Sequence, residues 1–274
     1  MFKKERLPNG RRHIYLFGIK ILSYKKSGKK KYVKNPERLH PDFYKQNICD
    51  YLLYQKHLFA YEYVKQFLFP RANVLEVGCG DGYGTCYINR SDINLEAIDV
   101  SKDAIKIAKS KYKNIKFKSF NGKDFNYPDN TFDVILSFQV IEHVESVEQY
   151  LKELRRILKP KGLLILTTPD RRYRLTKNQK PWNPFHLREY DLKLYKQDLK
   201  KIFPKTEIFS VLSSEEILDI EFNRVKPNRS DYDGKPIKMK QIKDFINKFS
   251  VKDFFVEKAK ESVIGLDILS VSKK

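Results

Sequence analysis

The 274-residue sequence predicts an α/β fold, in which a mostly parallel, doubly wound sheet carries helices on both faces. Short apolar runs alternate with segments of helical periodicity between residues 50 and 170, and their connections are short. One run, Val74–Val77, leads into glycines at positions 78, 80, 82 and 84, and the next ends on Asp99. A glycine-rich turn and a carboxylate are therefore expected at the carboxyl ends of two parallel strands.

The elements follow in order along the chain. An apolar stretch at 13–22 predicts a short strand or hairpin within an otherwise basic, irregular extension over residues 1–40. Apolar residues at three-to-four spacing predict one or two helices from Asp42 to Phe69, which Pro70 ends. The next strands are expected at 73–77, 95–100, 115–120, 134–138 and 163–168, with helices at 83–90, 102–112 and 146–158. Residues 41–274 would form the main domain.

Composition limits the possible functions. The net charge of +21 allows a nucleic-acid partner, but basic residues cluster only at 11–12, 25–34 and 171–174, and no RNA-binding module is recognisable. The apolar segment Ile14–Leu22 is shorter than the roughly 18 residues of a membrane span and contains Lys20. We therefore expect a cytoplasmic protein without a membrane span. Three cysteines without metal-ligand spacing fit a reducing compartment, and the oligomeric state stays open.

The glycine spacing separates two kinds of nucleotide site. In the dinucleotide-binding fingerprint the second and third glycines stand three apart, whereas Gly80 and Gly82 stand two apart. With Glu76 two positions before Gly78, the segment Val-Leu-Glu-Val-Gly-Cys-Gly-Asp-Gly resembles the first motif of class I S-adenosylmethionine-dependent methyltransferases. Residues 121–137, 140–144 and 151–169 resemble later motifs in the family's order, so the resemblance covers about residues 50–170.

The resemblance implies a fold and an activity. The fold is a Rossmann-like sheet of seven strands, with the sixth at about 207–212 and an antiparallel last strand at about 263–271. An insertion at about 214–262 would precede the last strand, and its part at 221–240 reads as a loop over the acceptor pocket. The implied activity is methyl transfer, with S-adenosylmethionine as cofactor.

The resemblance also assigns cofactor contacts. Gly78, Gly80 and Gly82 would let the loop approach the amino-acid part of the cofactor, and Glu76 would face its positive end. Asp99 would accept both ribose hydroxyls, because two carboxylate oxygens match a vicinal diol; a helix cap is the alternative. The remaining expected contacts are Lys56, Val100, Asn121, Gly122, Ser137, Phe138 and Gln139.

Two of these positions depart from the family pattern. Lys56 stands where arginine is common; it would pair with the methionyl carboxylate or lie on a solvated helix face. Asn121 stands where an aspartate usually reads adenine, and Asp124 is a possible substitute.

Two histidines lie where a base for a hydroxyl acceptor would be needed. His143 belongs to a Glu142-His143 pair that is widespread in the family, including members with different chemistries, which favours a structural role for the pair. His186 lies in Trp182–Tyr190, within an expected lid over about residues 170–190. This phrase resembles a lid of methyltransferases that act on sugars and other small hydroxylated substrates. We expect His186 to be the base or a substrate anchor, supported by Arg188 and Glu189, and we expect no metal.

The sequence thus predicts methyl transfer to a small molecule, with a hydroxyl of a sugar or nucleotide-linked sugar for bacterial capsule or lipopolysaccharide synthesis as the expected acceptor. The N-terminal extension resembles those of enzymes from surface-polysaccharide loci, although a packing or oligomerisation arm is an equal reading. An RNA methyltransferase and a non-catalytic cofactor-binding protein remain alternatives.

Overall fold

The computed structural model describes residues 2–6, 11–16, 19–25, 48–231 and 248–274. The chain divides into two compact units, Met1–Leu39 and His40–Lys274. In the first unit, β1 (Phe2–Arg6), β2 (Arg11–Leu16) and β3 (Ile19–Lys25) form an antiparallel sheet in that order. The expected hairpin segment contributes to the antiparallel pair β2 and β3, and the additional strand β1 makes the extension less irregular than predicted.

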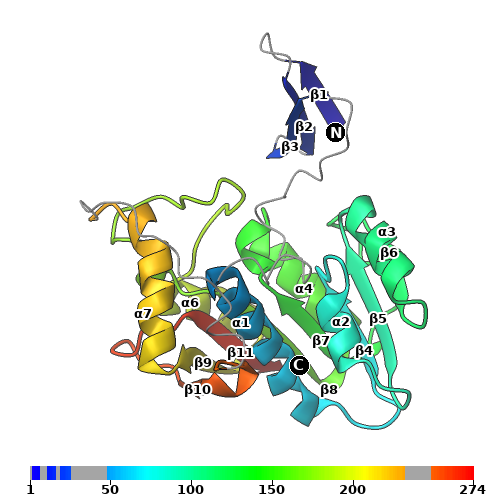
Figure 1. Ribbon diagram of the computed structural model, residues 1–274. Helices are drawn as coiled ribbons and strands as arrows, with labels where there is room; N and C mark the ends of the chain where they lie inside the picture. Colours follow the sequence, from blue (N-terminus) through cyan, green and yellow to red (C-terminus); the bar gives the residue numbers. More distant parts are fainter. Residues whose placement is uncertain (1, 7–10, 17–18, 26–47, 232–247) are drawn as a thin grey trace. The chain divides into compact units, whose positions relative to one another are not determined.

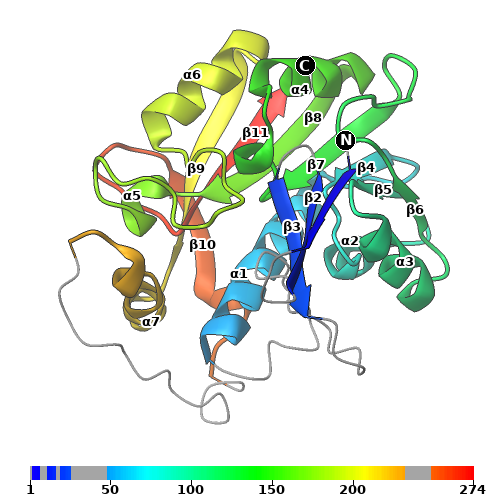
Figure 2. The same cartoon turned by 90° about the horizontal axis from the view of Figure 1, so that it is seen from above.

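The second unit is built on one eight-stranded sheet (Figures 1 and 2), whose order is β10-β9-β11-β8-β7-β4-β5-β6. Strands β8, β7, β4, β5 and β6 are parallel, whereas β11 is antiparallel to both β8 and β9. The strand bounds are β4 Asn73–Val77, β5 Asn94–Asp99, β6 Lys116–Ser119, β7 Phe132–Phe138, β8 Leu158–Pro169, β9 Lys205–Ser213, β10 Phe254–Lys258 and β11 Asp267–Lys273. The predicted α/β class and the antiparallel last strand are confirmed.

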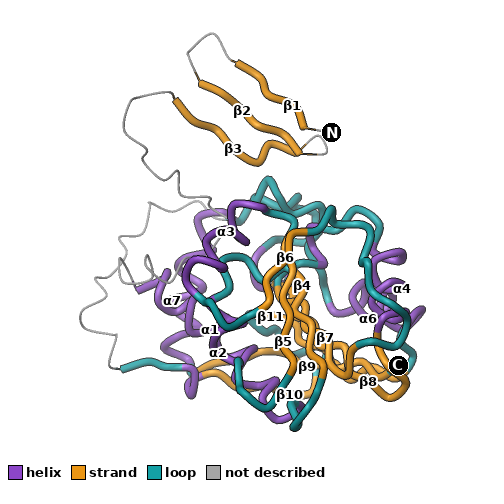
Figure 3. The backbone as a smooth tube through the Cα atoms, turned by 90° about the vertical axis from the view of Figure 1, so that its right-hand side faces the viewer, coloured by secondary structure: helices purple, strands orange, loops and turns teal. Residues whose placement is uncertain are grey.

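Helices cover both faces of this sheet (Figure 3): α4 and α6 lie on one face, and α1, α2 and α3 lie on the other. Their bounds are α1 Ile48–Val64, α2 Tyr83–Ile88, α3 Lys102–Lys111, α4 Val147–Ile157, α5 Arg171–Arg174, α6 Leu192–Ile202 and α7 Glu215–Val225. Ser101 caps α3 by accepting a hydrogen bond from the Ala104 amide, and Asp191 caps α6 through Leu194. Among the described residues, no helix has both the length and the apolar character needed to cross a bilayer.

The central strands are apolar on both faces because both faces are buried. Leu75 and Ile135 pack with Leu151 of α4, whereas Val74 and Val134 pack with Val64 of α1. Side chains alternate between the faces of a strand, so one short run contributes to both layers. This packing fixes β4 and β7 side by side, with their carboxyl ends at one edge of the sheet.

Two predictions about the C-terminal third were wrong. The sheet has eight strands rather than seven, because β10, within the predicted insertion, pairs antiparallel with β9 at its edge. The stretch from residue 221, expected to be a loop, begins within α7, where Ile217, Glu221 and Val225 bury one helical face at four-residue spacing. Residues 232–247 of the same prediction lie outside the described residues.

Candidate active site

The glycine loop joins β4 to α2 in left-handed backbone conformations. The φ angles are 83° at Gly78, 55° at Gly80 and 84° at Gly82. A β-carbon at Gly78 would lie 2.3 Å from Val140 Cγ2, and one at Gly82 would lie 2.7 Å from the Phe117 ring. A β-carbon at Gly80 would meet no atom within 4 Å. Gly78 and Gly82 are thus required by packing, whereas Gly80 leaves the backbone open on one side.

Asp99 ends β5 beside this loop, and its side chain is buried. One carboxylate oxygen accepts a hydrogen bond from the Gly80 amide at 2.9 Å, and the other accepts from the Ser101 amide at 2.7 Å. Because Ser101 is the N-cap of α3, Asp99 does not hold that position. Asp99 instead links the open glycine of the loop to the neighbouring strand.

Glu76 lies in β4, and 1% of its surface is exposed. The Tyr61 hydroxyl donates to one of its oxygens at 2.6 Å, and the Thr85 hydroxyl donates to the other at 2.5 Å. Burial raises the pKa of Glu76 to about 7. A β-carbon at Gly84 would overlap the Tyr61 ring, so glycine at 84 lets α2 approach α1. Glu76 joins three elements beneath the loop, and its predicted contact with the cofactor stays a prediction.

Lys56 does not lie on a solvated helix face. Its ammonium is buried and contacts Asp267 Oδ1 at 2.6 Å. The other oxygen of Asp267 accepts a hydrogen bond from the Gln139 side chain at 3.1 Å. Gln139, which has a φ of 56°, follows β7, so α1, β7 and β11 meet at this carboxylate. The methionyl carboxylate predicted for Lys56 would have to share its ammonium with Asp267.

Ser137 and Phe138 are the last two residues of β7. The Ser137 hydroxyl is fully buried and forms a 2.7 Å hydrogen bond with the Tyr150 hydroxyl of α4. Phe138 packs edge-on against Tyr61 of α1, with ring centroids 4.9 Å apart. Strand alternation sends the two side chains to opposite faces. The Ser137 side chain therefore faces the core beneath α4.

The loops after β5 and β6 lie next to each other. Val100 is 45% exposed, and a β-carbon at Gly122, whose φ is 85°, would lie 3.2 Å from its side chain. The Asn121 side-chain oxygen accepts from the amides of Lys123 and Asp124, and its amide group donates to the Asp124 carboxylate. The Asn121 side chain thus stabilises the turn over residues 121–124. Asp124, the possible substitute for Asn121 as the adenine contact, is a hydrogen-bond partner in the same turn.

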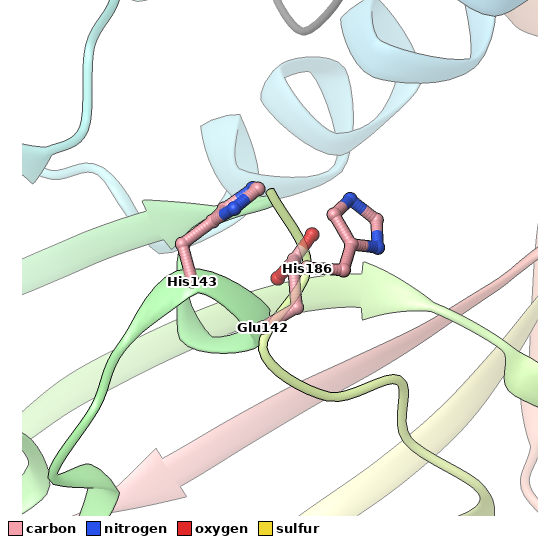
Figure 4. Close-up of side chains that lie close together, drawn as sticks. All are labelled: Glu142, His143 and His186. Carbon is pink, nitrogen blue, oxygen red and sulfur yellow. The ribbon is translucent and has the colours of Figure 1, made fainter. Parts of the chain in front are cut away.

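The structure brings together the two histidines predicted to act on the acceptor (Figure 4). His143 ends the short helix η3 (Ile141–His143), which follows β7, and His186 lies in the segment predicted to be a lid. Their rings meet edge to face, with centroids 4.8 Å apart. The backbone amides of Leu187 and Arg188 donate to the Glu142 carbonyl, which holds the lid against η3.

Hydrogen bonds orient both imidazoles. His143 Nδ1 lies 3.0 Å from the Phe185 carbonyl oxygen, and His186 Nδ1 lies 3.0 Å from Glu189 Oε1. A carbonyl can only accept, and an ionised carboxylate can only accept, so each Nδ1 carries the proton and the lone pair is on Nε2. Burial lowers the pKa of His143, which keeps its ring neutral near pH 7. Arg174 contacts the second oxygen of Glu189 at 3.2 Å.

Glu142 completes this group, although the sequence suggested a structural role for it. Its side chain is fully buried; Oε2 accepts a hydrogen bond from Thr168 at 3.0 Å, and Oε1 has no hydrogen-bond partner. Burial raises the pKa of Glu142 to about 7. Potential metal-ligating atoms of Glu142, His143 and His186 all lie within 4.8 Å of one another. The sequence contained one indication that Glu142 and His143 would lie near His186: both segments follow the carboxyl ends of predicted strands.

Comparisons with known proteins show what the central segment is similar to. Residues 75–166 match the family model described as a methyltransferase domain. A probable S-adenosylmethionine-dependent methyltransferase of Mycobacterium tuberculosis is 34% identical over 156 residues, which are 56% of this chain and 54% of that protein. A ubiquinone biosynthesis O-methyltransferase of Rickettsia conorii is 31% identical over 110 residues, 37% of this chain and 36% of that protein.

The fold has solved counterparts. A crystal structure from Thermotoga maritima, described as a possible histamine N-methyltransferase, superposes with a TM-score of 0.55 at 16% identity, over 82% of this chain and 92% of that one. At this identity the match shows the fold alone. The chain spans about half the length of the first mycobacterial relatives that it matches.

Proposed function

Since residues 75–166 match the model of a methyltransferase domain and the sheet has the fold of solved methyltransferases, we propose that the protein transfers a methyl group from S-adenosylmethionine to a small-molecule hydroxyl. One observation carries the proposal: the glycine loop with Asp99 and the oriented pair His143–His186 both follow the carboxyl ends of parallel strands in one sheet. In open α/β sheets, ligands bind at this edge.

The residues of the crevice fit the cofactor that this family and fold imply. The open side of Gly80 gives a ligand access to the backbone, and the Asp99 carboxylate lies against the same residue. Gly78, Gly80 and Asp99 would hold the cofactor, with Val100 and Gly122 beside its adenine end. When bound, S-adenosylmethionine supplies an electrophilic methyl group on a sulfonium.

Proton removal from the acceptor is assigned to His186. Its Nε2 carries the lone pair because Nδ1 donates to Glu189. Burial opposes ionisation of Glu189, but its hydrogen bonds with His186 and Arg174 lower its pKa, so it is an anion near pH 7. A fixed anion at Nδ1 stabilises the imidazolium that forms when Nε2 takes a proton. General-base catalysis of this kind typically contributes about 10²–10⁴-fold in rate.

The lid supports a polar ring as the acceptor, and we propose a sugar or nucleotide-linked sugar. The Arg174 guanidinium stacks over the Trp182 ring at 4.5 Å, which places an aromatic surface beside a cation and the histidine pair. The Gln179 side chain of the lid forms hydrogen bonds with the backbone of residues 228 and 230, which follow α7. An aromatic face with charged neighbours suits a hydroxylated ring. The relatives' printed names include both O- and N-methyltransferases, so the oxygen acceptor belongs to this proposal.

Methyl-labelled S-adenosylmethionine offered with a panel of nucleotide sugars and with total RNA tests the proposal. We expect label in a sugar fraction, and a loss of about 10²–10⁴-fold in His186→Gln with S-adenosylhomocysteine binding retained. Lys193→Gln, an exposed change just beyond the lid, is the matched control and should leave the rate unchanged. Label found only in RNA, or an unchanged rate in His186→Gln, would contradict the proposal.

A further inference from the structure

We propose that Glu142, His143 and His186 bind a divalent first-row transition-metal ion, in the manner of sites built from two histidines and one carboxylate (Figure 4). The sequence led us to expect no metal. That expectation relied on the absence of a spaced acidic cluster. A site in which His186 of the lid joins Glu142 and His143 does not need such a cluster.

The donor atoms are already close. The metal-ligating atoms of the three side chains lie within 4.8 Å of one another. An ion with bonds of about 2.0–2.2 Å in tetrahedral geometry separates its ligands by about 3.3–3.6 Å. Small side-chain rotations would therefore complete the site without moving η3 or the lid.

Glu142 is the independent indication that something binds here. Its carboxylate is fully buried, and Thr168 satisfies only Oε2. Oε1 has no hydrogen-bond partner, and Glu142 contributes a carboxylate oxygen to the cluster that contains both histidines. A buried carboxylate oxygen left without a partner is costly, and a bound cation would remove that cost.

The outer contacts of the histidines are those of metal ligands. A ligating histidine typically donates its other ring N–H to a carbonyl or a carboxylate, which fixes the tautomer and orients the ring. His143 donates to the Phe185 carbonyl, and His186 donates to Glu189. Arg174 in turn holds Glu189. Both rings therefore have their lone pair on Nε2, the nitrogen that would coordinate.

The donor set selects the ion. Two imidazoles and one carboxylate suit Zn²⁺, Mn²⁺, Fe²⁺ or Co²⁺, whereas Mg²⁺ and Ca²⁺ prefer oxygen ligands throughout. Three protein ligands leave at least one coordination position for an acceptor oxygen, whose pKa the ion would lower. In the metal-bound protein His186 Nε2 would be a ligand and not the base, so the ion would replace His186 in activating the acceptor. This catalytic role rests on the proposed methyl transfer to a hydroxyl. Metal binding itself does not depend on the proposed function, because coordination by His186 can be measured without any substrate.

Cobalt titration of the full-length protein tests the site. The protein is treated with a chelator, dialysed, and titrated with Co²⁺ alone, with visible absorption and calorimetry as readouts. We expect one ion per chain and visible bands typical of nitrogen-containing, four- or five-coordinate Co²⁺. Glu142→Gln, His143→Gln and His186→Gln should each weaken binding at least tenfold, while circular dichroism shows that they remain folded.

His57→Gln is the matched control, since His57 contacts Tyr83 and lies outside the cluster. It should bind Co²⁺ as the wild type does. Equal binding by the wild type and by the His143→Gln/His186→Gln double variant would overturn the proposal, as would loss of binding in His57→Gln alone. Because no cofactor or acceptor is present, failure of this test is separate from failure of methyl transfer.

Discussion

The glycine loop and the histidine cluster both follow strands of one sheet, but the chain assembles them over different sequence distances. The loop and Asp99 come from two successive strands and are joined by a direct hydrogen bond, and Glu76 of the first strand accepts from Thr85 in the first turn of α2. The cluster instead joins η3 to the predicted lid segment after β8, and backbone hydrogen bonds from that segment to the Glu142 carbonyl hold the two together. A site made from local segments can be read from sequence spacing, whereas one made by docking a lid depends on the tertiary fold.

The largest effect on stability is expected at the buried ion pair Lys56–Asp267. This pair depends on the tertiary fold, because it joins α1 to β11. Lys56→Met leaves a buried carboxylate without its cation, so we expect the free energy of unfolding to fall by about 3–5 kcal/mol. Denaturant unfolding measures the loss, and Lys56→Met/Asp267→Leu should recover most of it. If the double variant regains stability but does not bind S-adenosylhomocysteine, Lys56 also contacts the cofactor. If it regains both stability and binding, Lys56 has a structural role only.

The glycine loop itself separates packing from binding. Gly78→Ala would push a β-carbon against Val140 in a left-handed conformation, and should cost about 2–5 kcal/mol of stability. Gly80→Ala meets no protein atom and carries only the strain of its left-handed backbone, about 1–2 kcal/mol, so it should lose less stability than Gly78→Ala while weakening S-adenosylhomocysteine binding. Unfolding and calorimetric titration of both variants check this, and equal stability losses would contradict the assignment of an open side to Gly80.

Glu76 gives the crevice a pH dependence. Its pKa is about 7 when folded, above its value in the unfolded chain, so the folded state favours the protonated form. This stabilising contribution is complete at low pH and is lost as the pH rises from about 4.5 to 7. The difference in unfolding free energy between wild type and Glu76→Gln should therefore fall by roughly 3 kcal/mol between pH 4 and pH 8. A difference that is constant with pH would refute the shift.

Ser137 is expected to have the smallest effect. Its hydroxyl bonds Tyr150 beneath α4, so Ser137→Ala should cost about 1 kcal/mol of stability. Binding of S-adenosylhomocysteine, measured by calorimetry, should stay within twofold of the wild type. A tenfold weaker affinity would return Ser137 to the cofactor contacts that the sequence suggested.

Local signals explain what the sequence predicted. The strands β4 and β5, the glycine loop and the end of β5 at Asp99 were placed closely because apolar runs and turn residues define them within a few positions. The partner of Lys56 was missed because Asp267 lies at the other end of the chain. Helix α7 was missed because its buried four-residue spacing includes the charged Glu221, and strand β10 was missed because only Phe254 of its five residues is buried.

The candidate acceptor site shows the same limit. His143 and His186 were selected from their positions after strands, but nothing in the spacing indicated that Glu142 would lie buried between them with an unsatisfied oxygen. That property arises from the Thr168 contact and from the lid, both of which depend on how β8 and η3 pack.

Calorimetric titration with S-adenosylhomocysteine tests the central claim most directly, for the wild type, for Asp99→Ala and for Asp103→Ala. Asp103 is an exposed carboxylate in the first turn of α3 and serves as the matched control. We predict micromolar binding by the wild type and by Asp103→Ala, and no measurable binding by folded Asp99→Ala. No binding by the folded wild type, or equal binding by all three proteins, would contradict a cofactor crevice between the glycine loop and Asp99.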